Sequence, residues 1–325
     1  MDNKELCEII ECLPRGRTVF HYFKDRFALL LLRHLIGAGT SVADLKASRY
    51  APLLERRPVK ALLAACGDGW IDPRLVDLVW ADDAQAFVLT LSHWDGRRSR
   101  WSQTSRRGLN LVLQLNFSSA HDRRYRRQVQ PCHSAMLNGY GHPVMREGRR
   151  ELFRETLAWA RIDADLGYGE ALVEEVQSDW VRQAAALLHH ARACLSEGRG
   201  RVGWYGVQGE ARAVVDYVEY VLAPYQAIWA EAMLAVAIDF IHRELGIDTI
   251  YYHEFETGCR LKNIQGRRPP RSLYTTLPRR FCFEATERAP EFLLADKTFR
   301  REYRKVATPA WQRLKLREVR CARTA

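Results

Sequence analysis

The chain of 325 residues is 47% hydrophobic and carries a formal net charge of +11. This composition is typical of a folded globular protein and excludes a disordered chain, and the length accommodates one large domain or two. No apolar run of about 18 residues predicts a transmembrane span, and the N-terminus lacks the layout of a secretion signal. The eight cysteines contain no Cys-x-x-Cys pair, so we predict no metal site and a reducing, cytoplasmic compartment. Because no transmembrane span is predicted, we also predict no membrane partner. The sequence indicates no oligomeric state.

Residues 1–82 are predicted to form a helical subdomain. A long apolar-rich helix is expected over residues 18–36, because Gly37 follows it as a terminator. Shorter helices are expected over residues 59–66 and 72–80, the second of which begins at an Asp-Pro pair. A subdomain of this kind either covers one face of a larger sheet or docks onto a partner.

Two segments with period-two alternation follow. Residues 87–93 and 109–117 are predicted strands, and in the second the Leu and Phe side chains share one face. The opposite face carries Asn110, Gln114 and Asn116, which is the pattern of a strand with one buried and one polar face.

An arginine-rich belt occupies residues 96–130, which hold nine arginines against one acidic residue, with Trp101 and Tyr125 between them. Arginine-rich loops with aromatic residues suit a phosphate backbone and stacked bases, although each arginine alone also fits a solvated surface. The candidate residues for binding RNA, DNA or another polyanion are Arg97, Arg98, Arg100, Arg106, Arg107, Arg123, Arg124, Arg126 and Arg127. Residues 131–150 then have the composition of a loop, suited to a lid or a linker.

The central stretch of the chain is a predicted β-hairpin over residues 156–177. Strict alternation places Glu175, Gln177 and Asp179 on one face of its second strand. Glu174 then falls on the opposite face. Three polar groups in a row on one face are unusual for an ordinary buried strand.

These polar groups have two alternative roles. Buried charge is costly unless it is paired, so the row is expected to border a cleft or to meet a basic partner. Arg161 on the first strand is the natural partner for Glu174 or Glu175. Alternatively, Ser178 or Asp179 caps the helix that is predicted to run to residue 195.

A predicted strand over residues 248–255 follows a long helix over residues 224–245. A strand, a helical crossover and a second strand predict parallel pairing with the acidic strand. Ligands in open α/β sheets bind at the carboxyl ends of strands, so we expect His253 and Glu254 to border the same cleft as Gln177.

The C-terminal part is predicted to contain a short helix from residue 270, a strand over residues 280–284 and a basic tail over residues 296–325. A basic tail that is helical in parts is more typical of a solvated surface than of a binding arm. The predicted fold class is α+β, with a mixed, mostly antiparallel sheet flanked by helices. The predicted domains are a helical subdomain over residues 1–82, an α/β core over residues 83–295 and the tail.

The residues from Glu174 to Trp180 read Glu-Glu-Val-Gln-Ser-Asp-Trp. This stretch resembles the E-E-I-Q-S-D-W signature of large polyvalent proteins of phages and conjugative elements. In those proteins a helix, a G-x-D-x-I strand and a late Leu-Pro segment follow, and residues 246–250 and 277–278 match this order. The resemblance covers about residues 155–285 and implies a mobile-element context without a settled activity.

The later half also resembles the core of the GNAT acyltransferases, with an acidic strand, a helix, a Gly-Ile-x-x-Ile strand and a later Phe-Cys-Phe strand in that order. This resemblance implies acetyl-CoA or another CoA ester as the cofactor. It further implies Glu175 or Glu174 as a base that acts through water, and Tyr274 as the acid that protonates the leaving thiolate. The Q/R-x-x-G-x-G/A loop that holds the cofactor pyrophosphate in that family is not found, since residues 198–209 hold five glycines at a different spacing.

Two functions follow as alternatives. The first is a group-transfer, acyltransferase-like enzyme with an acidic and amide-lined cleft. Its candidate catalytic residues are Glu174, Glu175, Gln177, Asp179, His253, Glu254 and Tyr274. The second is a nucleic-acid-binding module of a mobile-element or defence-related protein, in which the acidic cluster is structural. A weaker third alternative is a nucleotide-directed transferase or nuclease whose acids bind a divalent ion.

Overall fold

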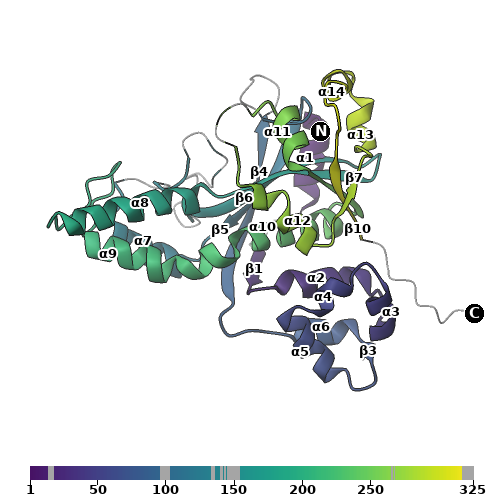
Figure 1. The fold of residues 1–325 in the computed structure, drawn as a ribbon, viewed down its shortest axis with the longest axis horizontal. Coiled ribbons are helices and arrows are strands. Elements are labelled where there is room, and N and C mark those ends of the chain that lie inside the picture. The colour runs from purple at the N-terminus through teal and green to yellow at the C-terminus, as the bar shows by residue number, and fades with distance from the viewer. Residues whose placement is uncertain are drawn as a thin grey trace, which may run out of the picture.

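The computed structural model describes residues 1–13, 18–95, 103–132, 136–139, 142, 144, 154–264, 266 and 268–316. Within these ranges the chain forms one eight-stranded sheet, one two-stranded sheet and helices around them (Figure 1). The predicted fold class is therefore confirmed, because the larger sheet is mixed, mostly antiparallel and flanked by helices.

The strand order of the larger sheet is β1-β4-β5-β6-β7-β8-β10-β9. Its neighbouring strands are antiparallel except β7 and β8, which are parallel as predicted. The strands are β1 (Thr18–Tyr22), β4 (Gln85–Asp95), β5 (Leu109–Asn116), β6 (Thr156–Asp165), β7 (Glu170–Gln177), β8 (Thr249–His253), β9 (Glu284–Thr286) and β10 (Trp311–Lys315). The predicted hairpin is the pair β6 and β7, which turns through Gly169 with a positive φ of 63°.

The crossover between β7 and β8 is helical. It comprises α8 (Asp179–Ser196), α9 (Ala211–Asp216), η2 (Tyr217–Val221) and α10 (Ala223–Arg243). Ser178 caps α8, because its Oγ accepts a hydrogen bond from the backbone N–H of Val181 at 3.1 Å. Pro224 lies in the first turn of α10, where its missing N–H removes no helical hydrogen bond. α10 packs against β6 and β7 and supplies much of the buried core.

No single helix in the described ranges is long and apolar enough to cross a membrane. α9 and η2 reach that length and composition only together with α10, and the two parts are bent by 45° relative to each other. The cytoplasmic location stays a prediction.

Two apolar cores lie on opposite faces of the larger sheet. Val173 and Tyr252 belong to the larger core, which includes α10. Their sequence neighbours Leu172 and Tyr251 belong to a smaller core with Phe292 and other residues of the C-terminal region, where α13 (Glu291–Ala295) and α14 (Lys297–Tyr303) lie. The central strands are therefore buried on both faces.

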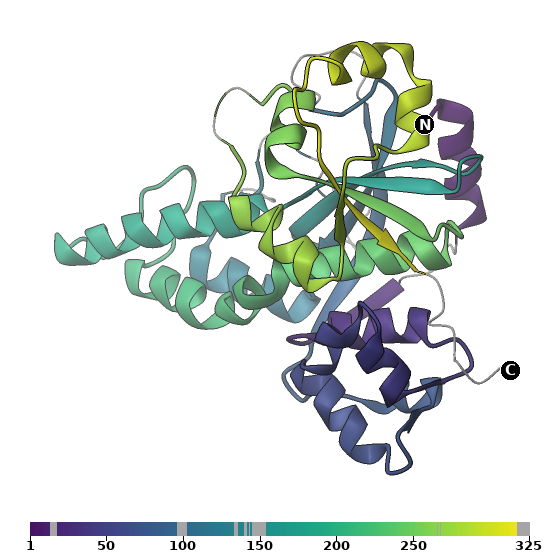
Figure 2. The same cartoon turned by 45° about the vertical axis from the view of Figure 1, so that its right-hand side comes forward.

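The N-terminal region contributes both to the sheet and to a group of helices beside it (Figure 2). This group comprises α2 (Arg26–Leu35), α3 (Val42–Ala47), α4 (Ala51–Leu54), α5 (Arg57–Ala65), α6 (Pro73–Leu78) and the paired short strands β2 (Thr40–Ser41) and β3 (Trp70–Ile71). α2 packs against α10, and Phe27 stacks on Phe281 with a centroid distance of 4.3 Å. α1 (Asn3–Cys12) packs instead against β5.

Two predicted elements are wrong. Residues 18–36 are not one helix, because Thr18–Tyr22 forms β1 and pairs with β4 at the sheet edge. The strand predicted over residues 280–284 is misplaced, because α12 (Thr276–Arg280) reaches its first residue and β9 begins only at Glu284. The helical subdomain consequently gives one strand to the main sheet.

The C-terminal strand β10 lies inside the predicted basic tail. It inserts between β8 and β9, and Trp311 at its start is completely buried. The indole N–H of Trp311 donates a hydrogen bond to Tyr303 Oη at 3.3 Å. The prediction that residues 296–325 form a solvated tail is therefore wrong for residues 311–315, where backbone pairing within the sheet outweighs the basic composition.

We predict that the substitution Trp311→Ala lowers the free energy of unfolding by about 3–5 kcal/mol, because it removes a large side chain from a packed core. Trp80 is the matched control, since it is 55% exposed and Trp80→Ala should cost about 1 kcal/mol or less. Urea denaturation of both variants measures the difference. Equal losses in the two variants would show that β10 does not contribute a buried core position.

Candidate active site

The parallel strands β7 and β8 separate at the carboxyl end of their pairing. The pairing ends at Val173 and Tyr252, and β7 continues to Gln177 without β8 beside it. β8 ends at His253, after which the chain turns into α11 (Phe255–Leu261). The last residues of β7 therefore pair with β6 alone, and no other strand covers their opposite edge.

A β-bulge sets the direction of the acidic side chains on β7. Arg161 of β6 pairs with Glu175, but the next residue, Ile162, pairs with Val173. Glu174 is thus one extra residue inserted into β7. A bulge of this kind redirects side chains and interrupts the two-residue alternation of a strand.

Glu174 and Glu175 consequently lie on the same side of the sheet. The segment that precedes β5 contacts both, because the backbone carbonyl of Gln103 accepts a hydrogen bond from Arg161 and Ser105 binds Glu174. The prediction that Glu174 faces away from Glu175 is wrong, because strict alternation does not allow for the inserted residue.

A cavity of about 740 Å³ lies beside the open edge of β7. Its walls come from the end of β7, the first turns of α8, Trp229 of α10 and the segment between α11 and α12, which includes η3 (Arg271–Leu273). Three of the predicted site residues line this cavity, namely Glu175, Gln177 and Tyr274. The expectation of a hollow beside the acidic row therefore holds for these three residues.

Lys262 connects β7 to Tyr274, which lie on different walls of the cavity. Its Nζ donates to the backbone carbonyl of Glu174 at 2.8 Å and to Tyr274 Oη at 3.4 Å. It also lies 3.8 Å from Glu175 Oε2 and is only 2% exposed. The sequence analysis missed this residue, because a single lysine after a short helix carries no pattern.

The ionisation states of the two facing groups differ. Burial by itself would raise the pKa of Glu175, but the charges of Arg161, at 2.7 Å, and of Lys262 hold that pKa below its usual range. Burial raises the pKa of Tyr274. At neutral pH the cavity therefore presents an ionised carboxylate and a protonated phenol.

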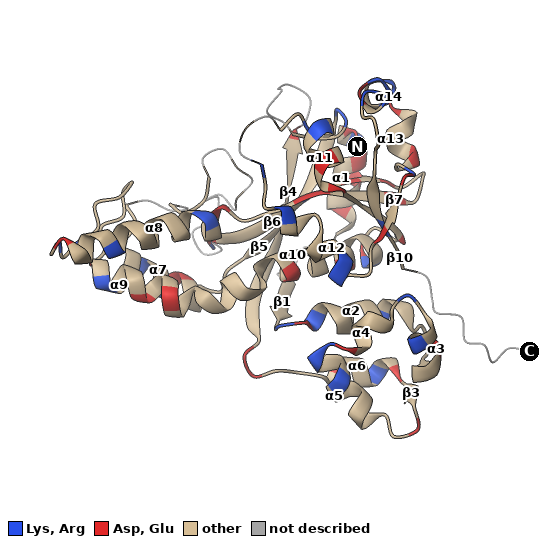
Figure 3. Cartoon of the chain, in the orientation of Figure 1, with Lys and Arg blue, Asp and Glu red and all other residues tan. Residues whose placement is uncertain are grey.

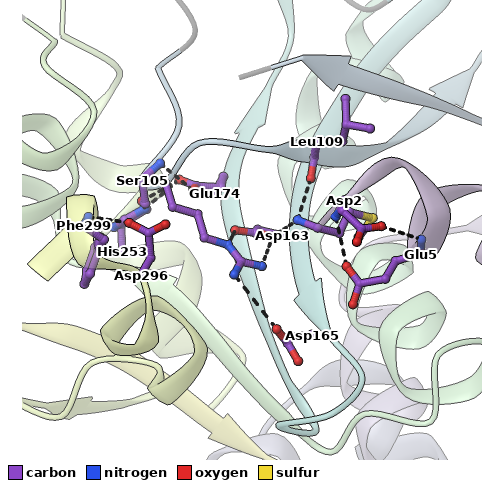
Figure 4. A network of polar contacts seen from close by, with 12 residues as sticks. Asp2, Glu5, Ser105, Leu109, Asp163, Asp165, Glu174, His253, Asp296 and Phe299 are labelled. Atoms are coloured by element: carbon purple, nitrogen blue, oxygen red, sulfur yellow. Dashed lines mark hydrogen bonds and ion pairs between the residues drawn. The ribbon is translucent and has the colours of Figure 1, made fainter. Parts of the chain in front are cut away.

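Glu174 and His253 form a completely buried pair (Figure 4). His253 Nε2 lies 2.9 Å from Glu174 Oε2, and Ser105 binds the same carboxylate through its backbone N–H at 2.8 Å and its Oγ at 3.0 Å. Burial lowers the pKa of His253, so the imidazole is neutral at pH 7. Burial opposes the ionisation of Glu174, but His253, Lys262 and the Ser105 N–H together lower its pKa to about 2.

Ser105, His253 and Glu174 do not form a catalytic triad. In a triad the hydroxyl and the carboxylate bind different nitrogens of the imidazole. Here both lie at Nε2, since Ser105 Oγ is 3.0 Å from that atom, and the buried Nδ1 has no hydrogen-bond partner among the described residues. This arrangement fixes the ends of β7 and β8 rather than activating a nucleophile.

Asp179 holds the first turn of α8 to a loop at the mouth of the cavity. It accepts hydrogen bonds from the backbone N–H of Gly139 at 2.9 Å and from Gln177 Nε2 at 3.1 Å, and it pairs with His142 and Arg182. Asp179 is completely buried, whereas His142 and Arg182 line the cavity. Both of these residues were missed, because their role depends on a contact between distant segments.

Four predicted catalytic residues therefore lie outside the cavity. Glu174, His253 and Asp179 are completely buried and do not line it. Glu254 is the N-cap of α11, where its carboxylate accepts hydrogen bonds from two backbone N–H groups. Capping and internal ion pairs explain these positions without a chemical step.

The arginine belt is divided by the structure (Figure 3). Arg106 is partly buried, with its side chain 14% exposed, and pairs with Asp163 at 2.7 Å. Asp163 also binds the N-terminal ammonium of Met1 at 3.1 Å (Figure 4). Arg107 is exposed. Four arginines, Arg123, Arg124, Arg126 and Arg127, are exposed on α7 (Ser119–Val129), which is a helix and not a loop. Arg97, Arg98 and Arg100, and most of the loop predicted over residues 131–150, lie outside the described residues.

No family model, curated protein or solved structure matches this chain. The two resemblances expected from the sequence are thus untested and stay predictions. Among the residues that the structure describes, no group of three or more His, Cys, Asp or Glu side chains is arranged to hold a metal ion. The candidate active site therefore rests on the cavity and on the separation of β7 from β8.

We predict that Glu174→Gln lowers the free energy of unfolding by about 3 kcal/mol at pH 7, because it leaves a buried cluster short of one negative charge. The pKa of Glu174 in the folded protein is about 2, below its ordinary value of 4.5, so its ionisation stabilises the fold above pH 4.5. This stabilisation is lost as the pH falls toward 2, and the difference between the variant and the wild type should shrink over that range.

Urea denaturation at several pH values between neutrality and pH 2 measures this difference. Glu8→Gln is the control, since the Glu8 side chain is 63% exposed and should show no pH-dependent difference. A constant difference between Glu174→Gln and the wild type at every pH would contradict the assigned ionisation.

Proposed function

We propose that the cavity beside β7 is the active site of a group-transfer enzyme that takes its acyl group from a CoA ester. The observation that carries this proposal is the separation of two parallel strands beside a cavity lined by Glu175 and Tyr274. The GNAT resemblance implies a notch between strands in this part of the fold and roles for the same two residues. The proposal therefore combines the expected chemistry with the observed opening.

The open edge of β7 suits the acyl donor. A strand edge binds an extended ligand through main-chain hydrogen bonds, and the pantetheine arm of a CoA ester is an extended chain that carries amide groups. Val176 and Ser178 line the cavity together with Glu175, so the wall runs along the strand itself. The donor would lie along this wall with its thioester near Tyr274.

The facing groups have complementary roles in acyl transfer. The acceptor attacks the thioester carbonyl, the carbon–sulfur bond breaks, and the protonated Tyr274 donates its proton to the leaving thiolate. The proton that the acceptor loses passes through water to solvent, from which Tyr274 is reprotonated. Glu175 is ionised and orients the attacking group through hydrogen bonds or a water molecule, since its lowered pKa makes it a weak base. Lys262 holds both groups in place through its contacts with Tyr274 and with β7.

Positive charge at the cavity mouth suits the phosphates of the donor. Arg182 and Arg268 line the cavity, and their side chains are 46% and 54% exposed. Arg182 lies near the start of α8, and Arg268 lies on the opposite wall of the cavity. Together they would bind the phosphates in place of the missing glycine loop.

A cavity-filling variant tests donor binding. We predict that wild-type protein binds acetyl-CoA and that Ala185→Trp weakens this binding at least tenfold, because Ala185 lines the cavity. Ala186→Trp is the matched control, since Ala186 is exposed on the same helix but is not part of the cavity wall. Isothermal titration calorimetry measures both affinities. Absence of binding by wild-type protein at millimolar acetyl-CoA and propionyl-CoA would overturn the proposed donor.

A second variant tests the acid role of Tyr274. We predict that Tyr274→Phe lowers the rate of CoA release from acetyl-CoA by about 10- to 100-fold while donor affinity stays the same. Tyr252→Phe is the control, because Tyr252 is completely buried next to Tyr274 and does not line the cavity. Release of the thiol is followed with a thiol-reactive dye. Equal rates for the two variants would remove Tyr274 from the reaction.

Nucleic-acid binding is the second candidate, favoured by the exposed arginines on α7. Phosphate contacts make affinity fall steeply with salt. Filter binding of RNA and DNA at two salt concentrations, with Arg123→Glu and Arg124→Glu combined in one variant, separates this candidate from the enzyme. A salt-dependent affinity that the variant loses would support it.

A further inference from the structure

The glycine-rich segment of residues 198–209 lies against the end of the arginine-rich helix α7, which itself packs against α9 and η2 (Figure 1). The backbone N–H of Cys132, just after α7, donates a hydrogen bond to the Gly206 carbonyl at 3.0 Å. The approach is close, since a Cβ on Gly209 would lie 2.3 Å from the carbonyl oxygen of Gln128. These contacts hold two segments together that are far apart in the sequence and that do not line the acyl-donor cavity.

α7 has one face against the protein and one face toward solvent. Its buried side chains are His121, Asp122, Tyr125 and Val129. Arg123, Arg124 and Arg127 are spaced so that they project opposite those side chains, and all three are exposed. Within the described ranges none of the three forms an ion pair, and the carboxylate of Asp122, the one acidic residue of the helix, lies 3.1 Å from His121 Nδ1 inside the protein. This arginine face, formed by Arg123, Arg124 and Arg127, therefore presents positive charge to solvent.

Tyr205 projects from the glycine-rich segment next to the end of α7. It is 82% exposed, more than any other large hydrophobic side chain in the described part of the chain. Its φ of 39° lies in the left-handed region, which is unfavourable for a residue other than glycine. The ring meets Trp204 edge to face at a centroid distance of 5.1 Å, and Trp204 packs against the larger core. An exposed ring on a strained backbone contributes little to the fold, so its use lies in contact with another molecule.

The aromatic residues expected among the arginines do not have this exposure. Tyr125 is completely buried in the inward face of α7, and Trp101 lies outside the described residues. Tyr205 takes their place from a different part of the chain. The combination of arginines and an exposed aromatic ring therefore arises from the fold and not from one stretch of sequence.

This combination matches the two chemical parts of a single-stranded nucleic acid. Guanidinium groups bind phosphates through paired N–H donors, and an exposed aromatic ring stacks on a base whose face is free. A duplex offers its phosphates, but its bases are stacked on one another. An anionic membrane also attracts arginines, but binding there requires a broad apolar face, whereas Tyr205 lies among the exposed polar residues Arg201 and Gln208.

We propose that the arginine face of α7 and the tip of residues 198–209 form a binding surface for single-stranded RNA or DNA. The arginines hold consecutive phosphates, and Tyr205 stacks on a base of the same strand. The backbone contacts between the glycine-rich segment and α7 fix the two parts relative to each other. This inference deepens the second candidate function and rests on it, and it is independent of acyl transfer.

Replacement of Tyr205 tests the stacking contact. Fluorescence anisotropy of labelled oligouridine, oligothymidine and a DNA duplex of equal length measures binding to the full chain at one salt concentration. Wild-type protein should bind at least one single strand about tenfold more tightly than the duplex, and Tyr205→Ala should weaken that binding about tenfold, whereas Tyr205→Phe should keep it. Tyr168→Ala is the matched control, since Tyr168 is 53% exposed at the turn between β6 and β7 and should have no effect.

Replacement of the arginines tests the phosphate contacts. Arg123→Glu combined with Arg127→Glu should weaken binding of the single strands and the duplex alike and should reduce the dependence of affinity on salt. Arg300→Glu combined with Arg304→Glu is the matched control, because these arginines are also exposed, have the same spacing at the end of α14 and change the net charge equally. Urea denaturation should show stabilities close to wild type for both pairs, since the replaced side chains are exposed.

Four results would overturn the proposal. They are no binding of either single strand at low salt, equal affinity for single strands and duplex, equal affinities of Tyr205→Ala and Tyr168→Ala, and equal losses in the two arginine pairs. Binding to phosphatidylserine vesicles without binding to oligonucleotides would assign the surface to a membrane instead. Salt-dependent binding that does not need Tyr205 would keep the second candidate function and remove only the single-strand preference. Acetyl-CoA binding is measured separately, so failure of the acyl-donor site is distinguishable from both.

Discussion

Charge balance inside the protein governs the region where β7 leaves β8. Arg161 and Lys262 bring two positive charges, and Glu174 and Glu175 bring two negative charges, while burial keeps His253 neutral. Removing an ion from water costs several kcal/mol and is offset only when the charge is paired and hydrogen-bonded. Because the four charges come from β6, β7 and the segment after α11, their mutual pairing fixes these elements relative to one another. Loss of any one member would leave its partner buried and uncompensated.

The β-bulge makes this balance compatible with a two-sided sheet. In a regular strand Glu174 would point into the larger apolar core, where Val173 and Val176 lie. The extra residue turns Glu174 to the side of Ser105 and His253 instead. The pairing of β7 with β8 ends just before this bulge, so one inserted residue coincides with both the paired charges and the open strand edge. The cavity therefore sits where the sheet is irregular and where charge is already concentrated.

The sequence was sufficient for the features that depend on local pattern. The hairpin and the parallel crossover follow from alternation and turn residues. The cap of α8 was narrowed to Ser178 or Asp179 and the partner of Arg161 to Glu174 or Glu175, and the structure selects Ser178 and Glu175. Glu175, Gln177 and Tyr274, which the sequence analysis grouped together, line one cavity. The sidedness of Glu174 could not be predicted, because a bulge shifts the register by one residue without any change in composition.

Other features depended on contacts between distant segments. β10 has five residues, three of them polar, and only its place between β8 and β9 accounts for its burial. β1 merges with the apolar helix that follows it, so their boundary carries no clear signal. Lys262 carried no pattern in the sequence, and Arg106 was grouped with the arginines expected to bind a polyanion, whereas the fold places carboxylates beside both. Propensity cannot reveal such partners, because they are separated by many residues in the chain.

Charged side chains on this side of the sheet form ion pairs, whereas several neutral polar side chains lack hydrogen-bond partners among the described residues. Arg106, Arg161, Glu174 and Glu175 each form an ion pair, whereas Asn110 Oδ1, Gln114 Nε2 and Trp159 Nε1 have no hydrogen-bond partner within the described part of the chain. An unpaired buried ion costs far more than an unpaired amide or indole N–H, so a stable fold must pair the ions first. The remaining deficit is small enough to be carried by a folded protein. The paired charges thus form a rigid frame directly beside the cavity that holds the proposed chemistry.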